Sequence, residues 1–198
     1  MRRIFIGTLV VLTIALINGC ANRKITRVDP SETIDLSGRW NDSDSRLVSE
    51  EMIGDLLTSA WIPRYLKAND KRPVVVVGLV ENKSHEHINS ETFIKDVEKA
   101  IIRDGNIRLV VAGEKRNELR KERAEQQDYA SPETTNKWGK ALGADFILQG
   151  TINSIVDAYK KQKVVTYQID LQLTNIETNE VVWMGDKKIK KQISDRIL

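Results

Sequence analysis

The chain has 198 residues, 31 Lys and Arg against 28 Asp and Glu, and a formal net charge of +3, which suits one domain of ordinary size plus a short additional segment. A charge this close to zero gives no evidence of nucleic-acid binding, which usually shows as a clustered basic surface. The single cysteine, Cys20, excludes an internal disulfide, and only two histidines are present.

The N-terminus has the organisation of a secretory signal. Arg2 and Arg3 precede a mostly apolar run over residues 4–17, which is too short for a membrane span, and the small Gly19 directly precedes Cys20. Removal of residues 1–19 would take away two arginines and no acid, so the formal charge of the mature chain falls from +3 to +1.

The run Ile17-Asn18-Gly19-Cys20 resembles a lipobox, with Asn18 as its one departure, since a small residue is commoner there. The resemblance implies that the Cys20 thiol receives a diacylglycerol and becomes a palmitate-bearing N-terminus, so that the lipid attaches the protein to a membrane. Ala21 follows the cysteine, and the absence of Asp there favours the outer membrane, with the domain in the periplasm. An ordinary signal peptide with a chance cysteine is the alternative.

Residues 20–43 are polar and predict a tether, which could reach roughly 80 Å at full extension. The folded domain is expected over residues 44–198. Its first element is a helix over Asp44–Trp61, capped by Ser43 or Asp44 and ended by Pro63. Apolar residues recur every four positions and predict its buried face, namely Val48, Met52, Leu56 and Ala60.

The middle of the chain alternates strand and helix. Pro73–Val80 has four consecutive valines and predicts a strand covered on both faces, followed by a polar loop over Glu81–Asn89. The next helix is expected to run to Asp104, with Asn89 or Ser90 as its cap, Gly105 as a left-handed stop, and an inward face formed by Phe93, Val97, Ala100 and Ile101. Ile107–Ala112 predicts a second strand.

Two further helices are predicted before the chain becomes β-rich. Glu114–Gln127 is highly charged, with Lys121 and Glu125 four residues apart, and is typical of a solvated helix. Ser131-Pro132 has the residues of an N-cap and a first helical turn, and Gly143 is suited to ending that helix.

The last third predicts three consecutive antiparallel strands. Ala144–Tyr159 is the first, with Gly150 as a possible bulge, and Lys160-Lys161-Gln162-Lys163 is a basic turn. Val165–Thr174 alternates apolar and polar residues, which indicates one buried and one wet face. Glu177–Glu180 is a tight turn, and Val181–Ile193 is the third strand. The expected fold is a single α+β domain whose mixed β-sheet ends in this three-strand meander, with helices mainly on one face.

No catalytic constellation is evident. His85 and His87 could begin a metal site with Glu86 or Glu81, but nothing supplies a spaced third ligand. The sequence has no nucleophile motif and no phosphate-binding glycine loop. We therefore expect no enzyme, and neither a metal, a cofactor nor a small-molecule substrate.

The lysines near the C-terminus form two clusters, Lys160, Lys161 and Lys163, then Lys187, Lys188, Lys190 and Lys191. Edge protection and solubility are the preferred interpretation, because lysines on an edge strand block unwanted pairing. Contact with an acidic partner or with lipid headgroups is the alternative. Among the aromatic residues, Trp183 and Phe93 are expected to be buried and Tyr159 to be available for contact.

Three stretches resemble the LpoB family of outer-membrane lipoproteins, which activate penicillin-binding proteins. They are Ala141–Gly150, which contains Leu-Gly-Ala-Asp, then Leu173–Trp183 and Pro73–Asn82. The resemblance covers about Arg72–Gln192, and the lipobox matches the same family. It implies no catalysis and no nucleic acid, but docking on a small accessory domain of a class A, bifunctional penicillin-binding protein, which stimulates cell-wall synthesis and thereby influences cell shape.

We expect the contacts to come from two places, the polar loop and the basic turn. The candidates are Asn82, Lys83, His85, His87, Tyr159, Lys160 and Lys161. One departure from the family is the tether, which is long and proline-rich in its best-known members and is neither here. The alternative is an envelope-assembly or secretion lipoprotein of the CsgG type, although a pore would need additional amphipathic hairpins.

Overall fold

The computed structural model describes residues 25–129 and 142–194. Of the described residues, those up to Glu32 belong to one unit and those from Thr33 onward belong to a second, compact unit. The signal segment, Cys20 and most of the helix predicted from Ser131 lie outside the described residues. In the part of the chain that is described, no helix is long and apolar enough to cross a membrane. The elements are α2 (Asp42–Thr58), α3 (Trp61–Asn69), β1 (Val74–Asn82), α4 (Ser90–Asp104), β2 (Arg108–Val110), α5 (Gly113–Tyr129), β3 (Phe146–Tyr159), β4 (Gln162–Asn175) and β5 (Val181–Ser194).

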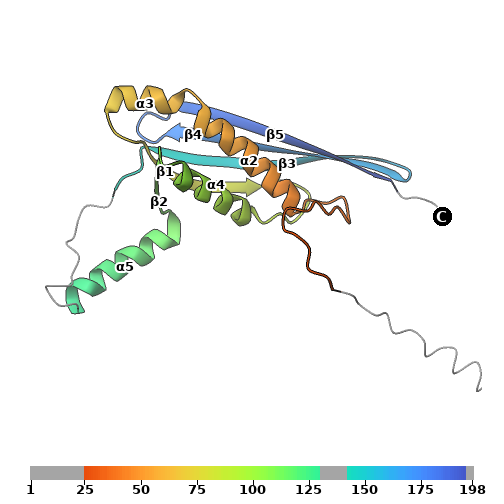
Figure 1. The fold of residues 1–198 in the computed structure, drawn as a ribbon, viewed down its shortest axis with the longest axis horizontal. Helices are drawn as coiled ribbons and strands as arrows, with labels where there is room; N and C mark the ends of the chain where they lie inside the picture. The colour runs from red at the N-terminus through yellow and green to blue at the C-terminus, as the bar shows by residue number, and fades with distance from the viewer. Residues whose placement is uncertain (1–24, 130–141, 195–198) are drawn as a thin grey trace, which may run out of the picture. The chain divides into compact units, whose positions relative to one another are not determined.

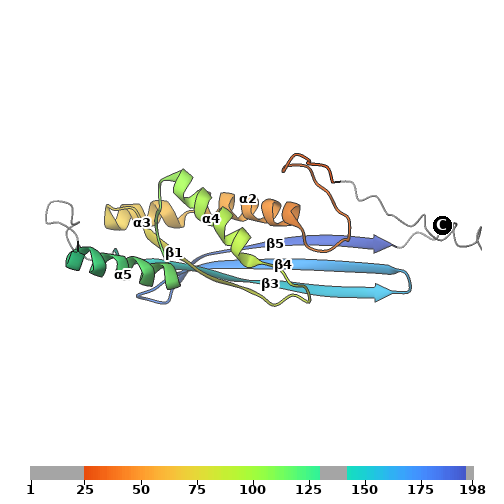
Figure 2. The same ribbon diagram turned by 90° about the horizontal axis from the view of Figure 1, so that it is seen from below.

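The five strands form one mixed sheet in the order β2-β1-β3-β4-β5. β1 is parallel to both β2 and β3, whereas β3, β4 and β5 form an antiparallel meander. Helices α2, α3 and α4 lie over one face of this sheet (Figures 1 and 2). The predicted α+β fold, with its C-terminal meander and its helices mainly on one face, is confirmed.

β4 is the centre of the core. Its predicted alternation is confirmed, because Val165, Tyr167, Ile169, Leu171 and Leu173 are all at most 2% exposed. Full burial of a Val, Leu or Ile side chain stabilises a fold by about 1.5–3 kcal/mol. The alternate residues of β4 are partly exposed on the helix-free face. The sheet therefore has the one wet and one dry face that the sequence indicates.

The helix predicted over Asp44–Trp61 is observed as α2, which ends earlier, at Thr58, and is followed by a helix that was not predicted, α3, from Trp61 to Asn69. Asn41, not Ser43 or Asp44, caps α2, in a reciprocal capping box with Asp44. The buried stripe includes Val48, Met52 and Leu56 but not Ala60, which is exposed at the break. The Trp61 indole N–H donates to the carbonyl of Leu56 (2.9 Å) and so secures the end of α2. Pro63 lies in the first turn of α3, where its missing N–H costs little.

α4 agrees closely with its prediction. Asn89 caps it by accepting a hydrogen bond from the Glu91 N–H, and Gly105 ends it in the left-handed conformation (φ 77°). Phe93, Val97 and Ile101 are buried, and Ala100 packs against the same core. The described side chains of α5 are largely exposed, which agrees with a solvated helix.

The predicted bulge lies in a different strand. The register between β1 and β3 shifts from Val77↔Leu148 to Val80↔Gly150, so the extra residue belongs to β1 rather than to β3. The insertion keeps Val77 and Val80 both buried and turns Leu79 outward. Gly150 has another role, because a Cβ there would collide with the carbonyl oxygen of Asp170 on β4.

β3, β4 and β5 continue well beyond the end of β1. The last pair that involves β1 is Asn82↔Ile152, whereas β3 runs on to Tyr159. We call the remaining part of these strands (residues 153–159, 162–168 and 188–194) the extension. Its core side is covered by residues 34–41, which we call the N-terminal segment. These residues are predicted from the sequence to lie in the tether, but they belong to the compact unit that begins at Thr33.

The Leu-Gly-Ala-Asp motif has a structural role at the opposite end of the sheet. The Asp145 carboxylate accepts hydrogen bonds from the Tyr65 hydroxyl (2.7 Å) and the Val74 N–H (2.9 Å), and pairs with Lys71 (3.5 Å). Its backbone N–H donates to Val74 O (2.8 Å). A single residue thus joins α3, β1 and the start of β3.

Replacing Asp145 with Ala should therefore lower the free energy of unfolding by about 2 kcal/mol, because it leaves the Val74 N–H without its partner. Chemical denaturation followed by tryptophan fluorescence measures this change. Asp157→Ala, on an exposed part of β3, is the control and should change stability by less than about 0.5 kcal/mol. Equal effects of the two substitutions would contradict the role of Asp145.

Candidate partner-binding site

The polar loop that follows β1 is held by Asn82. We call residues 83–88 the end loop. The Asn82 side-chain amide donates to Glu86 O (2.8 Å), and its oxygen accepts from the N–H (3.0 Å) and hydroxyl (2.7 Å) of Ser84. Ile88 is buried as an apolar anchor. Asn82, predicted as a contact residue, thus organises the loop that presents the other candidates.

His85 fixes the end loop against the extension. Its backbone N–H donates to Ser154 Oγ (3.1 Å), and its Nδ1 lies 2.7 Å from the same oxygen. The imidazole Nε2 lies 3.3 Å from Glu86 Oε1, and the ring stacks on Tyr167 with centroids 6.4 Å apart. One side of the imidazole is therefore occupied, whereas its side chain remains 37% exposed. His87 is exposed.

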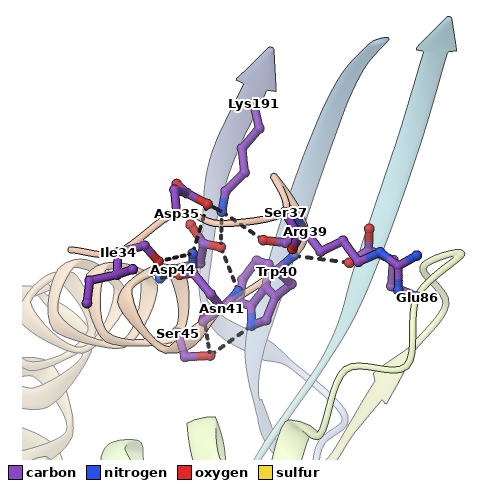
Figure 3. A network of polar contacts seen from close by, with 10 residues as sticks. All are labelled: Ile34, Asp35, Ser37, Arg39, Trp40, Asn41, Asp44, Ser45, Glu86 and Lys191. Atoms are coloured by element: carbon purple, nitrogen blue, oxygen red, sulfur yellow. Dashed lines mark hydrogen bonds and ion pairs between the residues drawn. The ribbon is translucent and has the colours of Figure 1, made fainter. Parts of the chain in front are cut away.

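Trp40 brings the N-terminal segment to the same place. Its backbone N–H donates to Glu86 Oε2 (3.0 Å), and its indole N–H donates to Ser45 Oγ (2.8 Å) at the start of α2. Its ring meets Tyr167 edge-on, with centroids 5.3 Å apart. Figure 3 shows Trp40 between Glu86 and the start of α2. The N-terminal segment, the end loop and β4 thus meet at Tyr167.

The Tyr167 side chain is completely buried under these contacts. Its hydroxyl makes no hydrogen bond, and Ser43 Oγ is the other such buried side-chain oxygen among the described residues. Burial, reinforced by the nearby Glu86 carboxylate, raises the pKa of Tyr167 well above its ordinary value. The Tyr167 hydroxyl therefore stays uncharged even above the ordinary tyrosine pKa of 10.0, and the ring serves as an aromatic platform.

Lys191 is the ionic anchor of the N-terminal segment. Its ammonium donates to Asp44 (2.7 Å), to Asp35 (2.9 Å) and to the carbonyl of Arg39 (2.9 Å), which uses all three of its N–H groups. The side chains of Lys191 and Asp44 are only 9% and 6% exposed. These contacts hold the segment against β5 (Figure 3).

The basic turn is a two-residue hairpin loop. Tyr159 pairs with Gln162 across Lys160 and Lys161, and Lys160 adopts a positive φ of 53°. Tyr159 is 73% exposed, and the Lys160 ammonium lies 5.2 Å from the centre of its ring. Both the aromatic face and the two positive charges are thus presented to solvent.

The seven predicted contact residues form two groups rather than one cluster. Asn82, Lys83, His85 and His87 belong to the end loop or its anchor, and Tyr159, Lys160 and Lys161 belong to the turn. Ser154, which binds His85, is five residues from Tyr159 along β3, a distance of roughly 17 Å at the rise of a strand. A partner that touches both groups must follow the edge of β3.

The structure assembles no metal centre in the part of the chain that it describes, since no group of three His, Cys, Asp or Glu side chains is placed to hold an ion. His85 is directed to Ser154 and Glu86 instead of toward His87.

Sequence reasoning missed Trp40, Glu86 and Lys191 as a connected set. Lys191 was grouped with the exposed lysines of β5. The signal that could have separated it is the period of the strand, because positions 183, 187, 189, 191 and 193 share one face and Trp183 on that face is buried. No sequence signal links Lys191 to Asp35, which lies 156 residues earlier.

The described part of the chain is thus a one-sided α+β sheet that carries a fixed loop and an exposed turn at one end. The comparison with protein families identifies the class of protein. The family described as "Peptidoglycan-synthase activator LpoB" matches residues 44–189. The chain belongs to the LpoB family, whose description is that of an activator rather than an enzyme. A comparison with curated proteins gives no match.

Among solved structures, the LpoB C-terminal domain from Escherichia coli is similar, with 18% identity, a TM-score of 0.42 and coverage of 77% of this chain and 99% of that one. The LpoB C-terminal domain from Salmonella enterica has 15% identity, a TM-score of 0.41 and coverage of 74% and 98%, respectively. The NMR structure of E. coli LpoB has 15% identity, a TM-score of 0.39 and coverage of 88% and 78%.

Replacing Lys191 with Met should lower the free energy of unfolding by about 3 kcal/mol, because it leaves the buried Asp44 carboxylate without its cation. Chemical denaturation measures the loss. Lys190→Met, which removes the same charge from the exposed face of β5, should cost less than about 0.5 kcal/mol. A loss no larger than that of Lys190→Met would contradict the anchoring role.

The stabilisation by Lys191 should also depend on pH. Burial alone would lower the pKa of this lysine, but the hydrogen bonds to Asp44 and Asp35 outweigh it and raise the pKa above the ordinary 10.5. The folded state then holds the proton more tightly than the unfolded state, so the stabilisation is complete below pH 10.5 and is lost as the pH rises through the higher folded value. The difference in stability between wild type and Lys191→Met should therefore shrink as the pH rises through that alkaline range.

Proposed function

We propose that this protein is a lipid-anchored lipoprotein of the outer membrane whose periplasmic domain binds and activates a class A, bifunctional penicillin-binding protein. The observation that carries the proposal is the family match over residues 44–189, which covers most of the folded unit. In this proposal the protein supplies binding energy, and the synthase supplies all the chemistry.

The proposed anchor is the lipid on Cys20. The folded unit begins at Thr33, thirteen residues later, and a chain of this length spans at most roughly 45 Å. This is about half the reach expected when residues 20–43 are all counted as tether. The domain would then work close to its anchor, and the synthase would have to approach it there.

The end loop and the basic turn are the proposed contact surface. The end loop is fixed by Asn82 and His85 before any partner arrives, so binding would lose little conformational entropy in ordering it. Lys160 and Lys161 place positive charge at the turn, whereas Lys83 at the other end is paired with Glu81 (3.1 Å). Such charges favour an acidic partner surface and accelerate encounter more than they add affinity.

Activation would follow from a difference in affinity. A ligand shifts a conformational equilibrium only by as much as it prefers one state over the other. The lipoprotein would bind the active conformer of the synthase more tightly than the inactive one, and so raise the active fraction. This account requires no catalytic group on the lipoprotein.

Binding of the purified synthase to the immobilised chain tests the proposal. Paired substitutions Lys83→Ala with His87→Ala, and Lys160→Ala with Lys161→Ala, should each weaken binding by about fivefold to tenfold, because they remove exposed contact groups. Lys188→Ala with Lys190→Ala removes two exposed charges elsewhere on the extension and should leave affinity within twofold of wild type.

Full affinity in both contact variants would exclude this surface. A wild-type chain that captures no class A synthase would exclude the proposed partner. The CsgG-type assembly or secretion role weighed from the sequence would then be the alternative, and capture of secretion components from solubilised envelope would support it.

A further inference from the structure

The two outer edges of the extension differ in their protection. β5 forms one edge and carries the exposed Lys188 and Lys190, whereas Lys187 pairs with Glu51 and the Lys191 side chain is only 9% exposed. Lysines on an edge strand prevent other strands from pairing with it. The other edge is β3 beyond the end of β1, where Asp157 is the only charged residue between Asn153 and Tyr159.

This part of β3 presents apolar side chains and unpaired backbone. Ile155, Val156 and Tyr159 are 72%, 42% and 73% exposed. Because Tyr159 and Gln162 close a two-residue turn, they form a hydrogen-bonded pair, and the odd-numbered residues of β3 point their backbone groups at β4. The backbone groups of Val156 and Ala158 therefore point away from β4, toward solvent. The Lys83 N–H bond to Ile152 O (2.8 Å) on the same outer edge agrees with this alternation.

Among residues 25–129 and 142–194, none pairs with the outer edge of Ile155–Tyr159, whereas the edge just before it is covered. The end loop binds Ile152 O through Lys83 and Ser154 Oγ through His85. Figure 2 shows β3 as the outer strand from that point to the hairpin turn. An extended segment of about five residues could pair with β3 there. It would lie on the same side of β3 as β1, which pairs with residues 146–152 of that strand.

A second copy of this chain is a poor occupant of this edge. The end loop leaves only residues 155–159 free, and antiparallel self-pairing centred on that stretch sets Asp157 directly against Asp157. Like charges directly opposite each other destabilise a sheet. A heterologous strand avoids this repulsion.

We propose that the free edge of β3, Ile155–Tyr159, binds an extended segment of the partner protein by strand addition. Main-chain hydrogen bonds to Val156 and Ala158 give this segment its affinity. The side chains on the helix-free face are those of Ile155, Asp157 and Tyr159. They favour a partner segment whose side chains opposite them are apolar, basic and apolar, in that order. An acidic residue of the segment would lie beside Lys160 and Lys161. The identity of the partner as the synthase rests on the function proposed above.

Val156→Pro tests the proposal directly in the full chain. It removes one outward N–H while leaving the hydrogen bonds to β4, and proline is tolerated on an edge strand. Val156→Thr is the matched control, since it keeps the N–H and the branched shape. The affinity for the purified synthase should fall about tenfold in Val156→Pro, because a hydrogen bond at the centre of the contact is lost, and should stay within twofold in Val156→Thr.

Amide hydrogen exchange of the wild-type full chain gives a second test that does not depend on the variant folding. Saturation with the synthase should slow exchange at Val156 and Ala158 by at least about tenfold, whereas the amides already bonded to β4 should change little. Unchanged exchange at Val156 and Ala158 in a complex that does form would overturn strand addition and leave the proposed function standing.

Two other outcomes would also overturn the inference. A wild-type dimer that becomes monomeric in Val156→Pro, measured by light scattering, would assign the edge to a second copy. A wild-type chain that binds no synthase would remove the function proposed above and, with it, this choice of occupant.

Discussion

Burial of Tyr167 is the constraint on which the far end of this structure depends. β3, β4 and β5 extend past the end of β1, and their core face needs a cover that continues beyond the main body of the sheet. Trp40 supplies it from the N-terminal segment and His85 supplies it from the end loop, and both rings lie against the same tyrosine. The segment that precedes α2 is therefore part of the folded domain. This cover explains how an extension of three strands can remain ordered beyond the helices.

Ionic contacts make that cover hard to remove. Lifting the N-terminal segment would expose the Tyr167 ring and separate Lys191 from Asp35 and Arg39. The Lys191 ammonium would then keep Asp44 as its remaining partner. The family match covers residues 44–189 and therefore excludes Asp35, Trp40 and Lys191. It does not account for this arrangement. The result is a platform with one edge protected by lysines and one edge open. An activator that acts by preferring one conformer of its partner benefits from such a rigid surface.

The sequence was most informative where local pattern and packing agree. The alternation of β4, the caps of α4 at Asn89 and Gly105, and the charged surface of α5 were all evident from period and residue type. The break between α2 and α3 was not evident from the sequence. Apolar residues continue through it, and proline is compatible both with a position after a helix end and with the first turn of a new helix, so Pro63 does not distinguish the two. Long-range polar contacts, such as Asp35 with Lys191, leave no local signal. The motifs that carried the family resemblance proved to be structural: Asp145 joins α3 to two strands, and Trp183 donates to Asp55 of α2 (2.8 Å).

The central claim is that a non-catalytic platform activates a peptidoglycan synthase. The most direct measurement is the rate at which a purified class A penicillin-binding protein polymerises its lipid-linked precursor, with and without saturating full-length lipoprotein in the same membrane. The account predicts a severalfold rise in rate with wild type and a smaller rise with the Lys160→Ala, Lys161→Ala variant. An unchanged rate under conditions in which the two proteins demonstrably bind would contradict it.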